Sequence, residues 1–257
     1  FVGPDGVLLV DSLFAPLSDR LVAAVRTISD GEIRFLINTH VHPDHIGGNE
    51  NLAGQGVLIF AHDNVRVRAL ERFRHPRGGG QRFLPAPPVG ARPVVTYNDT
   101  VSFHFNGEEV RAFLAPPAHT DGDTFVYFPE SDVLHLGDVF RTTSYPLIDV
   151  YNGGTLAGTI EALEMAIAMA GPDTRVIPGH GLRPVGRRAL VEFLDMTIDV
   201  RDQVLSLISQ GRTLEQVMAA QPTAAYDAQW GQEASWNAND FVPIVFYEIG
   251  GRSLFVP

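Results

Sequence analysis

Residues 37–50, INTHVHPDHIGGNE, place three histidines and an aspartate within six positions of the chain. The four residues are His40, His42, Asp44 and His45. Imidazole nitrogens and carboxylate oxygens are the ligands that borderline divalent cations such as zinc accept from proteins. Three histidines in a core without a metal or another partner would be costly to bury. The stretch therefore predicts a metal site.

The cluster follows an apolar segment with the pattern of a strand, in which alternate side chains point to the same face. His40, His42 and Asp44 stand at i, i+2 and i+4, so we expect them to project to one side. Pro43 favours an extended backbone at His42, which preserves the alternation. The glycine pair after the cluster permits a tight bend or a close approach of the backbone to another group. The pattern predicts a preformed chelate at the end of a strand.

Composition narrows the class of protein. The chain has 257 residues, of which 45% are hydrophobic, enough for a sizeable core in one large domain or at most two small ones. We expect a single domain over residues 1–257, with a helical C-terminal part, about 187–257, packed on it. The net charge of −11 argues against a nucleic-acid partner. The chain has no cysteine, which excludes thiolate chemistry. It also has no apolar run long enough for a predicted membrane span.

Apolar periodicity predicts strand–helix units, then a run of strands, then helices. Strand patterns fall at residues 7–11, 34–39, 57–61, 94–96, 101–105, 110–114, 124–128, 133–136 and 175–177. Helical patterns fall at 17–27, 63–72, 155–170, 187–209 and 213–220, the last with Thr213 as N-cap and Gln216 three residues later. This order indicates an α/β or α+β layered fold with helices outside the sheets. Residues 75–93 are so rich in glycine and proline that we expect no regular structure there.

Three more ligand candidates lie at the ends of apolar runs, where layered sheets commonly carry their catalytic groups. They are His119 in LAPPAHTDGDT, Asp138 in VLHLGDVF and His180 in VIPGHG. Each alone is explained equally well as a turn residue or a helix cap. The other histidines have no motif partner, and we interpret them as structural or surface residues: His62, His75, His104 and His135.

The pattern HVHPDH at residues 40–45 resembles the HxHxDH motif of the metallo-β-lactamase superfamily, and the later candidates match the family's remaining ligands in order. The resemblance implies a four-layer αββα sandwich and a site for two divalent metal ions. It implies that one ion is held by His40, His42 and His119, that the other is held by Asp44, His45 and His180, and that Asp138 bridges them. It also implies that Asp11, at the end of the first strand, supports these ligands.

The chemistry that follows is metal-assisted hydrolysis. Two divalent ions can share a water and lower its pKa toward neutrality. We hypothesise that a bridging hydroxide attacks a carbonyl polarised by the first ion, while Asp44 orients the nucleophile and takes its proton. Five imidazoles and two carboxylates suit zinc first and are compatible with iron or manganese.

The substrate is less defined. An aspartate stands at 138, where the best-known β-lactamases of the family have cysteine, as in thioesterases of the glyoxalase II type and lactonases. Arg141 and Asn152 fall near the family's substrate-carboxylate and oxyanion positions, and a surface salt bridge and a turn residue are the respective alternatives. We predict a β-lactamase-like hydrolase that opens a C–N, C–O or C–S acyl bond of a small, carboxylate-bearing molecule. The alternatives are a thioesterase or lactonase and, in another class, a non-catalytic metal-binding scaffold.

Other properties are weakly marked. We read Trp230, Trp236 and Phe241 as core packing, with a dimer interface as the alternative. A homo-oligomer is compatible with the sequence. The absence of thiols slightly favours a periplasmic or secreted location over the cytoplasm, although the sequence starts at Phe1 and a removed leader is not observable.

Overall fold

The chain divides into two compact units in the computed structural model, which describes residues 1–77 and 80–250. Unit 1 comprises Phe1–His75, Gln81–Ala115 and Gly122–Gly137, and unit 2 comprises Pro76–Gly80, Pro116–Asp121 and Asp138–Pro257. Gly78, Gly79 and residues 251–257, parts of the predicted loop and of the predicted C-terminal region, lie outside the described residues. The prediction of a single domain over 1–257 stays a prediction.

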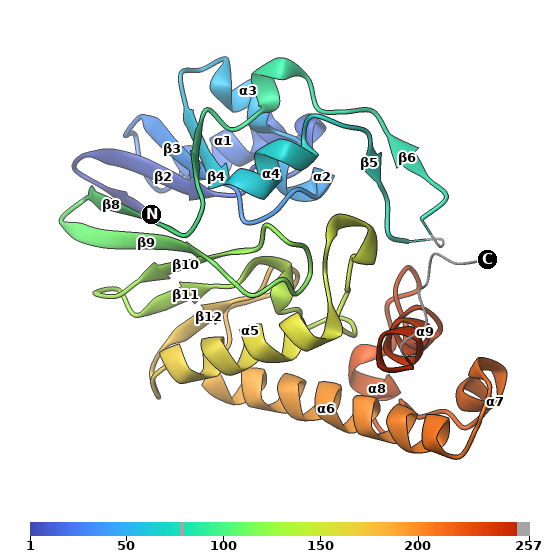
Figure 1. The fold of residues 1–257 in the computed structure, drawn as a ribbon. Helices are drawn as coiled ribbons and strands as arrows, with labels where there is room; N and C mark the ends of the chain where they lie inside the picture. The colour runs from blue at the N-terminus through green and yellow to red at the C-terminus, as the bar shows by residue number, and fades with distance from the viewer. Residues whose placement is uncertain (78–79, 251–257) are drawn as a thin grey trace. The chain divides into compact units, whose positions relative to one another are not determined.

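Unit 1 contains a mainly parallel sheet with the strand order β1-β2-β3-β4-β7 (Figure 1). Its strands are β1 (Val2–Gly3), β2 (Gly6–Val10), β3 (Ile33–Ile37), β4 (Leu58–His62) and β7 (Val95–Tyr97). The last four are parallel to one another, and β1 is antiparallel to β2. Val7 and Leu36 pack on one face of this sheet, whereas their neighbours Leu8 and Ile37 pack on the other. Burial on both faces explains why these strands are continuous apolar runs.

An antiparallel sheet in unit 1 covers the inner face of the first. It is built from β8 (Thr100–Phe105), β9 (Glu108–Leu114), β10 (Thr124–Phe128) and β11 (Val133–His135), each antiparallel to the next. Phe103, Phe105, Val110 and Val126 from this sheet share one buried cluster with Leu8 of the first. The alternation of apolar residues along β8 and β9 therefore marks a sheet-on-sheet core.

Short helices cover the outer face of the parallel sheet (Figure 1). They include α1 (Ser18–Arg26), preceded by the 3-10 turn η1 (Ala15–Leu17), and the helices α3 (Asn49–Ala53) and α4 (Asp63–Arg68). Val25 of α1 and Leu52 of α3 pack against Val7, Leu36 and Ile59. Unit 1 thus supplies a helix layer and two sheet layers.

Two expectations for this unit were wrong in part. The helix predicted for residues 63–72 ends at Arg68, because the chain then turns into β5 (Phe73–Arg74). The predicted irregular segment contains β6 (Phe83–Leu84), paired antiparallel with β5, and the 3-10 turn η2 (Val89–Ala91). Such two-residue strands and single turns carry no apolar periodicity, so the sequence pattern does not reveal them.

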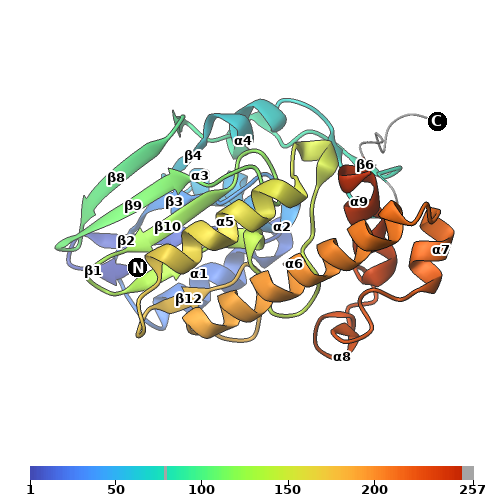
Figure 2. The same ribbon diagram turned by 60° about the horizontal axis from the view of Figure 1, so that its bottom comes forward.

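Unit 2 is mainly helical. It contains α5 (Leu156–Met169), β12 (Arg175–Ile177), α6 (Arg187–Ser209), α7 (Leu214–Ala219), α8 (Asp227–Trp230) and α9 (Ala238–Ile249). Helices α5 and α6 lie side by side (Figure 2). The helix predicted for 187–209 is confirmed with these bounds, and so is the N-terminal cap of α7, where Thr213 and Gln216 form a reciprocal capping box.

The C-terminal aromatic residues belong to the core of unit 2. Trp230, Trp236 and Phe241 are 6%, 2% and 0% exposed. The indole Nε1 of Trp236 donates to the carbonyl oxygen of Pro146 at 3.0 Å, and Tyr145 stacks on Phe241 with 5.5 Å between ring centroids. The interpretation of these residues as core packing is confirmed.

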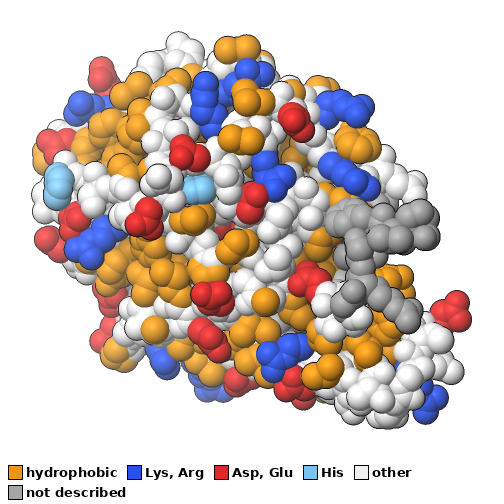
Figure 3. All heavy atoms as spheres, in the orientation of Figure 1, with side chains coloured by type: hydrophobic (Ala, Val, Ile, Leu, Met, Phe, Trp, Pro, Cys, Tyr) orange, Lys and Arg blue, Asp and Glu red, His pale blue; other side chains and the backbone are white. Residues whose placement is uncertain are grey.

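The surface carries both signs of charge. Carboxylates and arginines are interspersed over the face drawn in Figure 3. Among the helices of the described residues, none is both long and apolar enough to cross a bilayer.

Candidate metal centre

The histidine cluster of unit 1 lies where β3 gives way to a helical turn. Strand β3 ends at Ile37, and α2 (Pro43–Ile46) begins one residue after His42, whose backbone is extended with φ −66° and ψ 147°. Pro43 takes the first position of α2, where its missing N–H is not needed. The predicted extended conformation therefore holds at His42, whereas its continuation through Asp44 was wrong because the proline begins a helix.

The structure brings all four residues of the motif together. The ring centroids of His40 and His42 are 4.8 Å apart, and those of His40 and His45 are 4.0 Å apart. The Nε2 atom of His45 lies 3.7 Å from Oδ2 of Asp44. The three histidines are buried, whereas the side chain of Asp44 is 26% exposed. Asp44 is thus the member of the cluster most open to solvent.

Asp11 fixes the tautomer of His45. Its Oδ2 atom lies 2.7 Å from Nδ1 of His45, and its two oxygens also accept hydrogen bonds from the backbone N–H and the hydroxyl of Thr39, at 2.8 and 2.7 Å. A carboxylate can only accept, so Nδ1 of His45 carries the proton and Nε2 keeps the lone pair. This arrangement supports a metal-ligating histidine.

Thr39 fixes the tautomer of His40 in the same way. Its hydroxyl oxygen lies 3.0 Å from Nδ1 of His40. Because the single hydroxyl proton of Thr39 is donated to Asp11, the oxygen accepts from Nδ1–H of His40. The Nε2 atom of His40 therefore also has its lone pair available as a metal ligand.

The glycine pair after the cluster lies against backbone of the preceding loop. A Cβ on Gly47 would lie 2.4 Å from the carbonyl oxygen of Pro43, and one on Gly48 would lie 2.3 Å from that of Ser12. Ser12 N–H also donates to the carbonyl of His45 at 2.8 Å. The prediction of a close approach at these glycines is confirmed.

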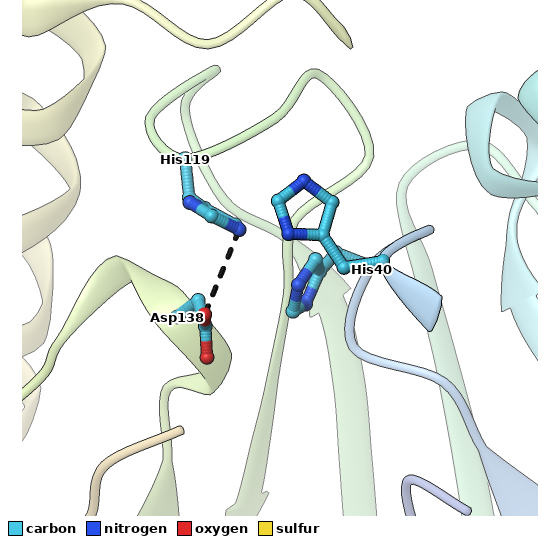
Figure 4. Close-up of side chains that lie close together, drawn as sticks. His40, His119 and Asp138 are labelled. Atoms are coloured by element: carbon cyan, nitrogen blue, oxygen red, sulfur yellow. Dashed lines mark ion pairs between the residues drawn. The ribbon is translucent and has the colours of Figure 1, made fainter. Parts of the chain in front are cut away.

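Unit 2 brings His119, Asp138 and His180 together. The Nε2 atom of His119 lies 3.7 Å from an oxygen of Asp138 (Figure 4), whose side chain is 2% exposed. The Nε2 atom of His180 lies 3.2 Å from the same oxygen. The Nδ1 atom of His119 faces the carbonyl oxygen of Leu147, which can only accept. His119 therefore carries a proton on Nδ1, and its Nε2 atom is the ring nitrogen that faces Asp138.

Backbone contacts hold these three residues in place. The carbonyl of His119 accepts from the N–H of Asp149 at 2.9 Å, and a Cβ on Gly154 would lie only 2.3 Å from that carbonyl oxygen. The carbonyl of His180 accepts from the N–H of Thr142 at 3.0 Å. Asp138 lies in the 3-10 turn η3 (Gly137–Val139), which begins at a glycine with φ +52°. Only glycine adopts that conformation at no steric cost.

The structure places the two predicted substrate-binding residues in different settings. Arg141 is 1% exposed, and its guanidinium lies 3.6 Å from Asp138 and 3.2 Å from Glu233. Asn152, in η4 (Val150–Asn152), is buried and donates from its side-chain amide to Asp149 at 2.6 Å. Asn152 thus has a structural contact within its own turn, and its oxyanion role stays a prediction. Glu233 belongs to no motif and lies 92 residues from Arg141, so no sequence pattern points to it.

Two of the remaining histidines have local structural contacts. His62 caps α4 by accepting from the N–H of Asn64 at 3.2 Å, and His135 accepts from the N–H of Gly137 at 3.1 Å. These contacts agree with the expectation that they are structural.

A sequence model of the Metallo-beta-lactamase superfamily matches residues 1–180, a span that includes both ligand clusters. The chain belongs to the metallo-β-lactamase superfamily. Its relatives include enzymes named as a sulfatase, a beta-lactamase and a hydrolase. A linear primary-alkylsulfatase of Pseudomonas sp. is 25% identical over 84% of this chain and 48% of its own length. A metallo-beta-lactamase type 2 of Bacillus cereus is 26% identical over 72% of this chain and 66% of its own length.

A hydroxyacylglutathione hydrolase of Brucella anthropi is 27% identical over 67% of this chain and 56% of its own length. The chain thus spans about half to two thirds of the length of these three relatives.

Two solved structures have the same fold. The sec-alkylsulfatase Pisa1 from Pseudomonas sp. has a TM-score of 0.71 and 19% identity over 99% of this chain and 47% of its own. A metallo-beta-lactamase from Pontibacter korlensis has a TM-score of 0.61 and 20% identity over 77% of this chain and 84% of its own. The mixed α/β fold, with several sheets and helices, is that of the superfamily's sandwich, as predicted.

Proposed function

We propose that the chain is a metal-dependent hydrolase of small molecules and that its two ligand clusters jointly hold two divalent ions. In this proposal His40, His42 and His119 hold one ion, Asp44, His45 and His180 hold the other, and Asp138 bridges them. The side chains that could together hold an ion fall into two groups in agreement with this division: His40, His42, His119 and Asp138, and Asp44, His45 and His180.

The observation that carries the proposal is the orientation of the imidazoles. The Nδ1 atom of His40 faces the hydroxyl of Thr39, that of His45 faces the carboxylate of Asp11, and that of His119 faces the carbonyl oxygen of Leu147. Each contact places a proton on Nδ1 and leaves Nε2 as the nitrogen that can bind a metal, as in metal-ligating histidines whose other nitrogen is hydrogen-bonded to a second group. A hydrogen-bonded histidine core would not require this same protonation state three times. The donor set of nitrogen and oxygen, without sulfur, favours zinc and accommodates iron or manganese.

Two bound divalent ions would supply an activated water and polarise the bond to be cleaved. The chain's own residues would do the rest. Asp44, the most exposed member of its cluster, would orient the attacking water and accept its proton. Asp11 would hold the ring of His45, and Thr39 that of His40, with Nε2 toward the metal. Arg141 would bind an anionic group of the substrate.

The acyl-bond substrates are those that the sequence predicts. A β-lactam is the first, and a thioester or lactone is the alternative. The names of the Bacillus cereus and Brucella anthropi relatives support the β-lactam and the thioester in turn.

A sulfate ester with an apolar tail is a second candidate, favoured by an observation in unit 2. A cavity of about 180 Å³ there is lined mainly by apolar side chains, among them Ile148, Val150, Trp236 and Ile244. It is somewhat larger than the apolar cavity of roughly 150 Å³ that accepts a benzene molecule. An alkylsulfatase relative also aligns with 84% of this chain. An alkyl chain in the cavity and the sulfate on Arg141 would use both features.

A substrate panel tests the proposal. Purified protein loaded with zinc, manganese or iron is assayed with a β-lactam, a thioester, a lactone and an alkyl sulfate. We expect turnover of at least one, lost in His42→Ala and Asp138→Ala and retained in His104→Ala, which removes an exposed histidine of β8. Bound metal without turnover on any substrate would contradict the hydrolase and favour the non-catalytic scaffold.

A further inference from the structure

Arg141 is a buried cation whose hydrogen-bonding capacity is only partly used. Its side chain is 1% exposed, and one terminal nitrogen donates to Oε2 of Glu233 at 3.2 Å. The other terminal nitrogen lies 3.6 Å from Asp138, which is too far for a hydrogen bond. That nitrogen and Nε are buried and donate to no acceptor among the described residues. Because a buried charge is costly unless it is hydrogen-bonded, this guanidinium can still gain from an additional acceptor.

Glu233 connects this buried arginine to a second, more exposed one. Its Oε1 atom accepts from Arg77 at 3.0 Å and from the hydroxyl of Ser235 at 2.8 Å. The exposed fraction of the side chain falls from 33% in Arg77 to 24% in Glu233 and 1% in Arg141. The carboxylate therefore caps the buried guanidinium and separates it from solvent.

The segment that carries Glu233 has no regular secondary structure. Residues 231–237 connect α8 with α9 and contain neither helix nor strand. Glu233 is held there by ion pairs with the buried Arg141 and the partly exposed Arg77 and by the hydrogen bond from Ser235. A ligand of the same charge and shape that displaces this carboxylate restores an ion pair to the buried guanidinium of Arg141, so the displacement exchanges one charged contact for another.

We propose that Arg141 and Arg77 form an oxyanion subsite, and that Glu233 occupies it as an internal carboxylate which the anionic group of a substrate displaces. The ligand class is a carboxylate or a sulfate monoester, because both present paired oxygens to a guanidinium. The inference rests on the proposed function only in assigning that anion to the substrate. Glu233 then determines the preference for charged ligands. An anionic ligand that displaces it forms ion pairs with both arginines, whereas a neutral ligand forms neither ion pair.

The protonation state of Glu233 agrees with the role of a competing anion. Burial raises the pKa of this carboxyl, but the hydrogen bond from Ser235 and the charges of Arg141 and Arg77 outweigh it, so that the pKa lies below its usual range. Glu233 is therefore ionised near neutral pH.

Anion binding tests the subsite without turnover. Inorganic sulfate and acetate are titrated separately into the metal-loaded protein and its Glu233→Gln variant, and tryptophan fluorescence is recorded, because Trp236 lies three residues from Glu233. We expect Glu233→Gln to lower the Kd of at least one anion about fivefold, by removing the internal competitor. The anion that responds identifies the sulfate or the carboxylate as the preferred class.

Three further variants keep the result interpretable. Ser235→Ala, which removes one hydrogen bond to the carboxylate, should shift the Kd in the same direction by less. Glu192→Gln removes an exposed glutamate paired with Arg188 at 2.7 Å and should leave the Kd unchanged. In the Glu233→Gln, Arg141→Gln double variant the gain should disappear. An unchanged or weaker affinity in folded Glu233→Gln, or a gain that persists in the double variant, would overturn the subsite. Loss of hydrolysis on every substrate would overturn the proposed function and leave these titrations unaffected.

Discussion

The Oδ2 atom of Asp11 lies 2.7 Å from Nδ1 of His45, although 34 residues separate the two along the chain. Asp11 adopts a left-handed backbone conformation with φ +63°, which is uncommon outside glycine but which aspartate adopts more readily than most residues. Its carboxylate also accepts both hydrogen bonds from Thr39. One side chain thus sets the protonation of two candidate ligands, His45 directly and His40 through Thr39.

We expect Asp11→Ala to weaken metal binding by about 10- to 100-fold, because an outer carboxylate contributes that much to the affinity of the histidine it orients. Competition with a chromophoric chelator measures the affinity. Asp19→Ala, which removes an exposed carboxylate in the first turn of α1, is the matched control and should bind metal as the wild type does. Equal affinity in the two variants would show that Asp11 does not support the ligands.

A side chain at Gly48, the second glycine after the histidine motif, should destabilise the fold. A Cβ at Gly48 would lie 2.3 Å from the carbonyl oxygen of Ser12, so Gly48→Ala must displace backbone and should lower the free energy of unfolding by about 1–3 kcal/mol. Gly54→Ala is the control, because the backbone of Gly54 is helical and its Cβ would lie 3.4 Å from the carbonyl oxygen of Glu50. We expect this variant to be more stable than the wild type by less than about 1 kcal/mol. Urea unfolding followed by circular dichroism gives both values. Equal destabilisation at both sites would rule out the steric explanation.

The carboxylate of Glu248 should make stability depend on pH. Its Oε2 accepts from the N–H of Leu156 at 2.7 Å, whereas Oε1 is buried and accepts no hydrogen bond from the described residues. Burial raises the pKa of Glu248 above its ordinary value, although the hydrogen bond from Leu156 opposes the shift. The folded state therefore binds the proton more tightly than the unfolded state, and stability falls as the pH rises from the unfolded pKa through the folded one.

Glu248→Gln keeps the acceptor and removes the charge. We expect it to raise the free energy of unfolding by about 1 kcal/mol at pH 7.5 and to have almost no effect at pH 4, where both states of the wild type are largely protonated. Glu161→Gln on α5 serves as the control at an exposed position. A gain that is the same at both pH values would contradict the assignment.

Local patterns predicted the long elements and the ligand clusters. The helix at 187–209 was predictable because its apolar residues recur at helical spacing over six turns, and its bounds agree with the structure. Thr213 and Gln216 marked a helix start because a capping box is encoded within four residues. The HxHxDH motif identified its four residues without any knowledge of the fold.

Features that depend on contacts between distant residues were not predictable. The pairing of Arg141 with Glu233 is specified only by the fold, so Arg141 could be named as an anion-binding residue but not its internal partner. The helical turn at Pro43 competes with the alternation of the preceding residues, and the proline prevails because position 43 is the first of α2. Two-residue strands such as β6 are shorter than any periodicity that a sequence can reveal.

Metal stoichiometry tests the central proposal most directly, namely that the chain holds two divalent ions through its histidine and aspartate side chains. Protein stripped with a chelator and reloaded with zinc is dialysed, and its metal content is measured by mass spectrometry for the wild type, His42→Ala from unit 1 and Asp138→Ala from unit 2, with circular dichroism to confirm folding. We expect two ions per wild-type chain and fewer than two in each folded variant. A wild-type chain that retains only trace metal, or variants that still retain two ions, would contradict it.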